Sequence, residues 1–295
     1  MLGVVNLDKP VGVTSHDMVG LLRRLSGMRR IGHAGTLDPL ASGVLPILVG
    51  AATRFSEELT GGRKRYDATV RFGIRSATDD AEGPLEPSGA PLPDRSAIEA
   101  ALDGQRGTFD QLPPAFSARK QGGMVAHRAA RAGAPLDLPP RSVTVAQLEL
   151  LELQIGEGWL DARLDVVCGA GTYIRSIARD LGEALGCGAH LHALRRLEAA
   201  GLRADTAVTP EELERLAADG ALEDAVLPIT DLLPFAQLTV DDPAFLHGSP
   251  TRLDDSEPDG RRVVLDGGGR LLGIGSVSHG VLQPEKVVGS LAVEA

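Results

Sequence analysis

One carboxylate stands alone in a glycine-rich and apolar stretch, residues 32–50, which reads GHAGTLDPLASGVLPILVG. Asp38 is the only formal charge in this stretch, and His33 is its only other titratable residue. Pro39 disfavours helical backbone at the preceding residue, so Asp38 is expected in an extended segment or a turn. A buried carboxylate needs a cation, a ligand or a chemical role, because burying it bare costs several kcal/mol or shifts its pKa. The pattern indicates a reactive aspartate, and the alternative is an ordinary turn residue.

Three further side chains are candidates for chemistry because they lie at the edges of expected elements. The chain has only two tyrosines, Tyr66 and Tyr173, and each has a basic residue close by in the sequence. Arg175 follows Tyr173 in the first turn of an expected helix, and an arginine close to Asp38 would favour the ionised carboxylate. Each tyrosine could equally be a half-buried core aromatic, Arg175 a surface arginine, and His33 a hydrogen-bonded loop residue.

The elements that must position these residues follow from the spacing of apolar side chains. Residues 14–27 predict a helix with a capping box at its start and a closing glycine. Residues 65–74 alternate as a strand, with Tyr66 at its first position on the apolar face. Thr172 is expected to cap a helix whose apolar stripe carries Arg175 on its flank, able to turn inward. Other expected elements are a buried segment at 44–49, helices within 93–107 and 209–220, a hairpin of 148–155 with 160–168, and a second hairpin within 262–277.

Composition bounds the class of protein. The chain has 295 residues, of which 43% are hydrophobic and 24% charged, as is ordinary for a soluble globular protein. No apolar run approaches the roughly 18 residues of a membrane span, and no secretory signal is visible. Cys168 and Cys187 lack metal-ligand spacing and are expected to be reduced core thiols of a cytoplasmic protein. No Walker loop, dinucleotide fingerprint, HExxH or CxxC motif is present, so phosphate-loop, dinucleotide and zinc chemistry lack support.

The net charge of −10 hides an uneven distribution of charge. Residues 204–260 contain fourteen acids and two arginines, a local net charge of −12, which leaves about +2 for the rest of the chain. A binding site for RNA depends on local basic clusters and not on the overall charge. Three such clusters flank the candidate site, although each alone could be solvated surface charge; they comprise Arg23, Arg24, Arg29 and Arg30, then Arg63, Lys64 and Arg65, then Arg119, Lys120, Arg128 and Arg131.

Several segments together resemble the TruB family of tRNA pseudouridine synthases. The resemblance covers about the first 235 residues in the correct order, with a weaker match in the C-terminal part. The combination of a GH-x-G-x-LDP-x-A-x-G-x-L string with GTYIRS is far more specific than any single short motif. The matching segments are KPVGVTSHDMV, GHAGTLDPLASGVLPILVGAATRF, KRYDATVRFG, LPPAFSARKQGG and GTYIRSIARDLGEALGCGAHLHALRRL.

The resemblance implies a fold, a division into domains and a reaction. It implies an α+β catalytic domain, residues 1–234, built on a mixed and largely antiparallel sheet with an RNA-binding insertion at about 111–141. Residues 235–295 would form a small β domain of the PUA-like, RNA-binding type. The implied reaction isomerises uridine to pseudouridine at position 55 in the T loop of tRNA, after the target base has been flipped out. The implied enzyme is cytoplasmic and monomeric, binds the tRNA T stem-loop, and uses no cofactor, metal, nucleotide or membrane.

The resemblance also assigns roles to individual residues. Asp38 corresponds to the family's nucleophile, Tyr66 to its stacking tyrosine and Arg175 to its carboxylate-pairing arginine. His33 matches the histidine beside the displaced RNA, while Tyr173 and Leu194 match residues that line the uracil pocket. Two positions depart from the family pattern, where tyrosine is common, and put details of RNA contact in doubt; they are His127 and Ala193.

Three alternatives compete with this interpretation. His33 and Asp38 also fit the H-x-x-x-x-D pattern of glycerolipid acyltransferases, although no membrane-facing segment accompanies it. A non-catalytic RNA-binding or tRNA-folding module could use the same pocket, although the retained Asp38, Tyr66 and Arg175 favour activity. The same enzyme could also act on another RNA, because such targets are recognised by shape more than by a short code.

Overall fold

A large mixed sheet organises the fold. The computed structural model describes residues 1–117, 119–134, 136–254 and 256–288. All pairings of described strands in this sheet are antiparallel except the parallel pairing of β3 with β12, which confirms the expected mixed, largely antiparallel sheet. The strand order is β14 (Val226–Leu227), β1 (Gly3–Lys9), β3 (Ala41–Val49), β12 (Ala189–Ala199), β4 (Lys64–Phe72), β11 (Trp159–Cys168), β10 (Arg141–Gly156) and β7 (Gly107–Gln111), with β2 (Ile31–His33) on β3 and β13 (Leu202–Arg203) on β12.

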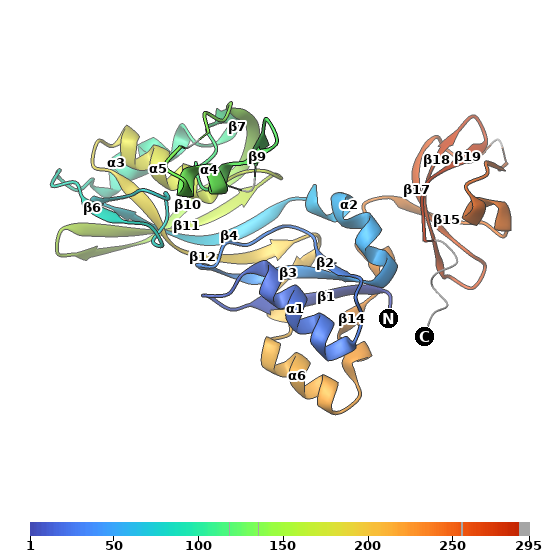
Figure 1. The fold of residues 1–295 in the computed structure, drawn as a ribbon. Helices are drawn as coiled ribbons and strands as arrows, with labels where there is room; N and C mark the ends of the chain where they lie inside the picture. The colour runs from blue at the N-terminus through green and yellow to red at the C-terminus, as the bar shows by residue number, and fades with distance from the viewer. Residues whose placement is uncertain (118, 135, 255, 289–295) are drawn as a thin grey trace.

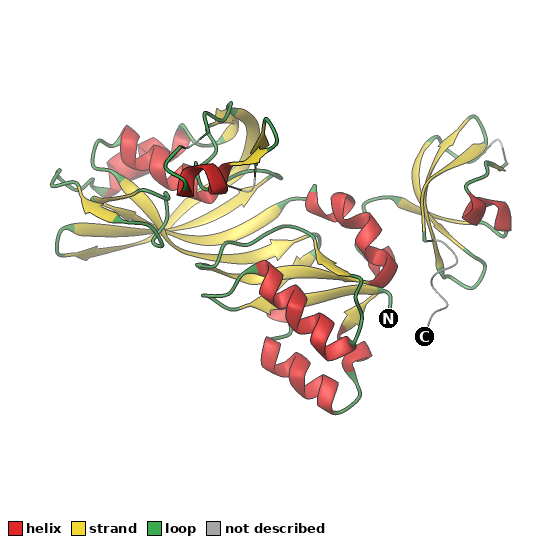
Figure 2. Ribbon diagram, in the orientation of Figure 1, coloured by secondary structure: helices red, strands yellow, loops and turns green. Residues whose placement is uncertain are grey.

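Helices lie beside both halves of the sheet (Figures 1 and 2). Helices α1 (Ser15–Ser26) and α6 (Pro210–Ala218) lie together next to the β1–β3 half, and α3 (Arg95–Asp103) and α5 (Ile174–Ala184) lie next to the β10–β11 half. Helix α2 (Ser56–Thr60) leads into β4. Apolar side chains from α1, α5 and the central strands form one continuous core. No helix in the described part of the chain is long and apolar enough to cross a membrane.

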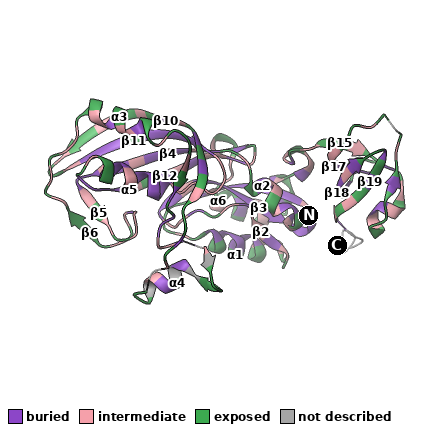
Figure 3. Ribbon diagram, turned by 90° about the horizontal axis from the view of Figure 1, so that it is seen from above, coloured by how far each residue is buried: buried purple, intermediate pink, exposed green. Residues whose placement is uncertain are grey.

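The basic excursion forms a small separate structure at the edge of the body. It contains the hairpin of β8 (Lys120–Gln121) with β9 (Met124–Val125), followed by helix α4 (Ala126–Arg131). In the view of Figure 3, α4 projects away from the sheet and from the other helices. A second short hairpin pairs β5 (Ile74–Ser76) with β6 (Leu85–Pro87).

The C-terminal part forms a second sheet to one side of the first (Figure 1). It has its own core, built around Phe245, Val264 and Leu282. The expected hairpin within 262–277 is confirmed by the antiparallel pairing of β17 with β18. The strand order is β15 (Ala236–Thr239), β17 (Gly260–Leu265), β18 (Leu271–Ser278), β19 (Val281–Val287) and β16 (Thr251–Arg252).

Most local predictions are confirmed, and two are wrong. Thr14 and Asp17 form the expected capping box, and Gly27 closes α1 in the left-handed conformation. Tyr66 lies on the apolar face of β4 as expected, but it is the third residue of the strand and not the first. Thr172 does not cap α5, because its hydroxyl donates a hydrogen bond back to the Gly169 carbonyl and the helix begins only at Ile174.

Candidate active site

A cavity of about 800 Å³ opens beside the loop that carries Asp38. Its wall is formed by the loop between β2 and β3, the buried face of β4, the loop after β5, and the start of α5. The cavity therefore brings together segments that lie far apart in the sequence. Five of the six expected site residues line it, and they are Asp38, Tyr66, Tyr173, Arg175 and Leu194.

Arg175 connects the Asp38 loop with two other parts of the wall. Its Nε lies 3.0 Å from Asp38 Oδ2, and its Nη1 lies 3.2 Å from Asp80 Oδ2. The guanidinium also donates hydrogen bonds to the carbonyl oxygens of Thr78 at 3.3 Å and Phe116 at 3.0 Å. The Arg175 side chain is 7% exposed, so its charge acts where little water screens it. The expectation that Arg175 turns inward to pair with Asp38 agrees with this geometry.

Asp80 is a part of the site that the sequence pattern did not reveal. Its carboxylate is 3% exposed and accepts hydrogen bonds from the Thr78 hydroxyl and from the Glu82 backbone N–H at 3.1 Å. These hydrogen bonds hold the Asp80 carboxylate in place independently of its ion pair with Arg175. Asp80 therefore orients the guanidinium through Nη1, while Asp38 pairs with Nε.

The Asp38 carboxylate is open to solvent on one side and buried on the other. Its side chain is 37% exposed, so the cavity without RNA does not exclude water as fully as the apolar sequence context indicates. Burial raises the pKa of Asp38, the Asp80 charge raises it further, and Arg175 and Lys9 act in the opposite direction. The net direction is upward, so the arginine reduces the cost of ionising Asp38 without removing it.

Backbone contacts hold the Asp38 loop in place. The Ser15 hydroxyl, at the start of α1, donates to the Leu37 carbonyl at 3.0 Å and accepts from the Leu37 N–H at 2.9 Å. Lys9 Nζ donates to the Pro39 carbonyl at 3.4 Å and to the carbonyls of Pro10 and Val13, both at 2.8 Å. Ser15 and Lys9 are both buried, so the loop that presents Asp38 is fixed from α1 and from the end of β1.

Arg196 fixes the same loop from β12. Its side chain is 1% exposed and donates to the carbonyl oxygens of Val44 at 2.7 Å, Gly35 at 3.0 Å and Thr36 at 3.4 Å. Gly43 permits this close pairing, because a Cβ there would lie 2.2 Å from the Arg196 carbonyl oxygen. Its φ of 100° also lies in a region that disfavours other residues.

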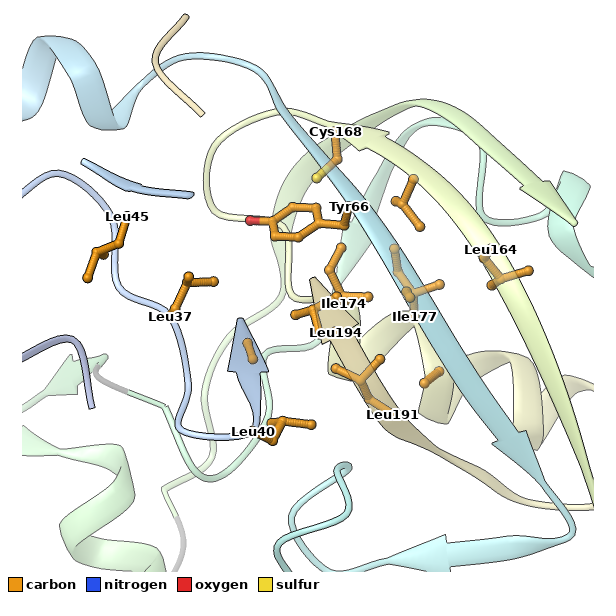
Figure 4. Packing of buried hydrophobic residues seen from close by; sticks show 14 of the residues in the cluster. Leu37, Leu40, Leu45, Tyr66, Leu164, Cys168, Ile174, Ile177, Leu191 and Leu194 are labelled. Carbon is orange, nitrogen blue, oxygen red and sulfur yellow. The ribbon is translucent and has the colours of Figure 1, made fainter. Parts of the chain in front are cut away.

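Tyr66 lies in an apolar part of the wall. Figure 4 shows its ring among Cys168, Ile174 and Leu194, with the hydroxyl directed toward the side on which Leu37 and Leu45 lie. Tyr66 is 7% exposed and Leu194 is 9% exposed. Burial raises the pKa of the Tyr66 hydroxyl, which keeps it protonated at neutral pH. These residues provide a flat and an aliphatic surface, as a planar base requires.

Tyr173 lines the cavity, whereas His33 is not among its described lining residues. Tyr173 is the N-cap residue of α5, and its backbone exchanges two hydrogen bonds with the Gln111 side chain, of 2.8 Å and 3.1 Å. His33 lies on β2, opposite Ile47, and is not among the described residues that line the cavity. Burial lowers the pKa of His33, and its Nδ1 has no hydrogen-bond partner in the described structure.

The root of the basic excursion is attached to α5. Ser176 Oγ and Arg179 Nη2 both donate to the Leu112 carbonyl, at 2.8 Å and 2.9 Å. With the Arg175 contact to Phe116, these bonds connect the excursion directly to the side chain that pairs with Asp38. The side chain of His127, one of the two departures from the family pattern, lies outside the described residues.

The second departure has a clear position. Ala193 is exposed on β12, at the register shift between β12 and β4, while its neighbour Leu194 is buried in the cavity wall. Ala193 therefore does not line the pocket.

Among the described residues, no three His, Cys, Asp or Glu side chains gather as a possible metal site.

Comparison with family models covers most of the chain. The model for the TruB family pseudouridylate synthase (N terminal domain) matches residues 23–174, and the model for the tRNA pseudouridylate synthase B C-terminal domain matches residues 175–234. Proteins named tRNA pseudouridine synthase B are similar over nearly the whole length. The protein from Burkholderia lata is 42% identical, with 97% of this chain and 90% of its own length covered. The protein from Stutzerimonas stutzeri is 41% identical, with 98% and 96% covered.

Solved structures show the same fold. A chain in the crystal structure of a Cbf5-Nop10-Gar1 complex superposes with a TM-score of 0.72 at 26% identity, covering 97% of this chain and 85% of that one. A chain in the archaeal box H/ACA sRNP Nop10-Cbf5 complex gives a TM-score of 0.71 at 25% identity, covering 97% and 86%. The similarity extends over both sheets, since nearly all of this chain is covered.

Proposed function

The chain belongs to the TruB family of tRNA pseudouridine synthases, and from that membership we propose that it converts uridine to pseudouridine at position 55 in the T loop of tRNA, with Asp38 as the nucleophile. The chain is an isomerase of the pseudouridine synthase B type. The position of Asp38 is the observation that supports its assignment as the nucleophile. Asp38 is ion-paired with the buried Arg175 and lines a cavity whose wall also contains Tyr66.

The reaction breaks the bond between C1′ and N1 of uridine and forms a bond between C1′ and C5. The base stays in the site and turns between the two steps. An ionised Asp38 can attack the base or the sugar, or it can assist departure of the base by removing a proton from the sugar. Each route requires the carboxylate to be deprotonated, and the Arg175 guanidinium at 3.0 Å favours that form.

The other residues of the wall have supporting roles in this proposal. Tyr66 stacks on the uracil and offers its hydroxyl for proton transfer, while Leu194 helps to retain the detached base. Tyr173 borders the pocket from the start of α5. His33 lies on the strand that leads into the Asp38 loop, outside the cavity, where it can occupy the space that the flipped nucleotide leaves.

The proposal extends to the partner and the setting. The enzyme binds the T stem-loop as a monomer in the cytoplasm, with the excursion at about 111–141 closing on the RNA. Residues 1–234 form the catalytic domain, and residues 235–295 form a PUA-like domain that adds RNA contacts. Binding depends on Arg and Lys contacts with phosphates and weakens as salt is raised.

The test is incubation of the purified protein with a T stem-loop that contains the target uridine. Because the isomerisation changes no mass, the product is detected by pseudouridine-specific chemical labelling. Product at the position equivalent to 55 supports the proposal. Tight binding without product would support a tRNA-folding module, and product only in other RNAs would support a different target. Membership of the TruB family argues against the acyltransferase alternative.

A further inference from the structure

Two parts of the cavity lining differ in charge. In one part of the lining, the three carboxylates of Asp38, Asp80 and Glu82 outnumber Arg175 and the nearby Lys9, so this part has a net negative charge. The lining also contains two buried cations, Lys64 at 8% exposure and Arg196 at 1%. They are close to each other, because a Cβ on Gly35 would lie 3.6 Å from Arg196 Nη1 and 3.9 Å from Lys64 Cε.

Neither cation has an anionic partner among the residues that the structure describes. In the described part of the chain, no Asp or Glu lies within 4.0 Å of Lys64 Nζ or of the Arg196 guanidinium. Lys64 Nζ donates to the carbonyls of Thr60 at 2.8 Å and Gly62 at 3.0 Å, which leaves one of its three protons without a described acceptor. Arg196 donates to three backbone carbonyls and interacts with the neutral Tyr66 hydroxyl, none of which is an anion.

The neighbouring side chains do not supply the missing charge. Burial raises the pKa of the Cys168 thiol to about 11, so it is neutral beside Lys64. Burial also raises the pKa of Tyr66, so its hydroxyl is neutral beside Arg196. Two buried cations without a counter-charge are costly, since buried charges in proteins are normally paired or hold a ligand. This part of the cavity lining is therefore suited to an anion.

We propose that Lys64 and Arg196 form a subsite for an RNA backbone phosphate next to the target uridine. The proposal rests on the function proposed above and adds the position of the phosphate. Lys64 precedes Tyr66 by two residues on the same face of β4, which is roughly 7 Å along a strand. A uracil stacked on Tyr66 thus brings a phosphate of its own nucleotide or of an adjacent one within reach of Lys64.

The same arrangement orients the nucleotide in the cavity. The carboxylates of Asp38, Asp80 and Glu82 repel a phosphate, and the cations Lys64 and Arg196 attract it. A nucleotide bound this way presents its base and ribose toward Asp38 and its phosphate toward Gly35. Arg196 also holds the carbonyls of Gly35 and Thr36, so binding of the phosphate is coupled directly to the loop that carries the nucleophile.

The test is a double-mutant cycle that combines one substitution in the protein with one modification of the RNA backbone. The protein change is Lys64→Met, because replacing Arg196 would also release the Asp38 loop. The RNA change replaces a single phosphate on either side of the target uridine with an uncharged methylphosphonate. For one of these two linkages, we expect the wild type to lose about 10-fold to 100-fold in kcat/KM and in RNA affinity.

The result for Lys64→Met together with the neutral linkage decides whether Lys64 contacts the phosphate. Lys64→Met should lose a similar factor with intact RNA and lose no more with the sensitive neutral linkage, because the two changes remove the same contact. The slope of log affinity against log salt should fall in magnitude by about 0.7 to 0.9. Arg95→Met removes an exposed cation from a helical ion pair on α3 and should leave both quantities unchanged.

Two results would overturn the subsite. One is that neither neutral linkage affects the wild type, a measurement that does not depend on how the variant folds. The other is that the losses multiply, which would show that Lys64 only connects α2 with β4. Absence of product from the wild type with intact RNA would refute the function proposed above, while the same cycle measured as dissociation constants would still test the phosphate contact.

Discussion

Arg175 Nε lies 3.0 Å from Asp38 Oδ2, yet Asp38 is only one of the groups that hold the Arg175 side chain in place. The guanidinium is also fixed by the buried Asp80 and by the carbonyls of Thr78 and Phe116. In the proposed reaction, Asp38 can therefore leave the ion pair without disordering Arg175. The positive charge remains available to the site throughout the reaction, as expected of a preorganised electrostatic environment.

The first prediction concerns the nucleophile. Asp38→Asn should lower the rate of pseudouridine formation by more than about 10⁴-fold, because the amide cannot form or support the covalent step. RNA affinity should stay within about threefold, since Arg175 keeps its other contacts. The measurement is single-turnover labelling of pseudouridine together with a binding titration. Asp67→Asn makes the same change in an ion pair with Arg163 outside the cavity and should leave the rate nearly intact; retained product in Asp38→Asn would refute the assignment.

The second prediction concerns the residue that positions Arg175. Asp80→Asn should lower kcat by about 10-fold to 100-fold with a small change in KM, because it loosens a group whose geometry matters more in the transition state than in binding. Kinetics at saturating RNA distinguish the two parameters. A purely structural role for Asp80 would instead lower the melting temperature and leave kcat of the folded fraction unchanged.

The third prediction concerns the acid limb of the pH profile. Burial raises the pKa of Asp38 above its ordinary value of 3.8, and only the ionised form reacts, so kcat/KM should begin to fall with decreasing pH earlier than for an exposed aspartate. The Asp80 charge contributes to this rise. Asp80→Asn should therefore move the acid limb to lower pH, even as it lowers the maximum. A limb that moves to higher pH would show that loss of Arg175 outweighs loss of the repulsion.

The local structure could be predicted from the sequence where a short pattern determines it. The capping box of α1 and the alternation of β4 are confirmed because each depends on residues a few positions apart. The helical stripe showed that Arg175 could turn inward, but its contacts with Asp38 and Asp80 are long-range. The cap at Thr172 is wrong because the same hydroxyl had a competing acceptor, the Gly169 carbonyl, in the turn before α5.

Residues whose roles depend on distant pairing could not be predicted. Asp80 lies in an acidic, proline-rich and glycine-rich loop that resembles an exposed connection, and it becomes buried only because the loop forms a bridge with Leu191 of β12. Lys64 and Arg196 each occur in a run of charged residues, which resembles surface. The parallel pairing of β12 with β3 and the packing of α2 bring them into the cavity. No local periodicity encodes such contacts.

The fourth prediction is a pH dependence of stability due to Lys9. Burial lowers its pKa from 10.5 to about 8, although the Asp38 charge acts in the opposite direction. Between these values the unfolded chain binds a proton that the folded protein does not, so the free energy of unfolding should rise with pH. A rise of about 1 to 3 kcal/mol between pH 7 and pH 10 is expected. Urea titrations should show a smaller rise for Lys9→Met; an equal rise would assign the effect to other groups.

The fifth prediction concerns the attachment of the C-terminal sheet. Glu58 of α2 is 4% exposed and pairs with Lys286 at 2.9 Å and with Arg261 at 3.2 Å, both from that sheet. Glu58→Gln removes the buried carboxylate, while Lys286 keeps Glu57 and Arg261 keeps Glu285, and should cost about 1 to 2 kcal/mol of unfolding free energy. Glu57→Gln is the matched control, because Glu57 pairs with the same Lys286 but is 84% exposed and should cost less than about 1 kcal/mol.

The pH dependence of the same pair of variants separates the ion pair from simple packing. Burial acts to raise the pKa of Glu58, but hydrogen bonds from Lys286 and Arg261 lower it overall. A carboxyl with a lowered folded pKa stabilises above its unfolded value, near 4.5, and loses that contribution as pH falls through the folded value. The difference between wild type and Glu58→Gln should therefore shrink in acid. A difference that stays constant down to pH 3 would mean that the carboxylate charge does not hold the C-terminal sheet against α2.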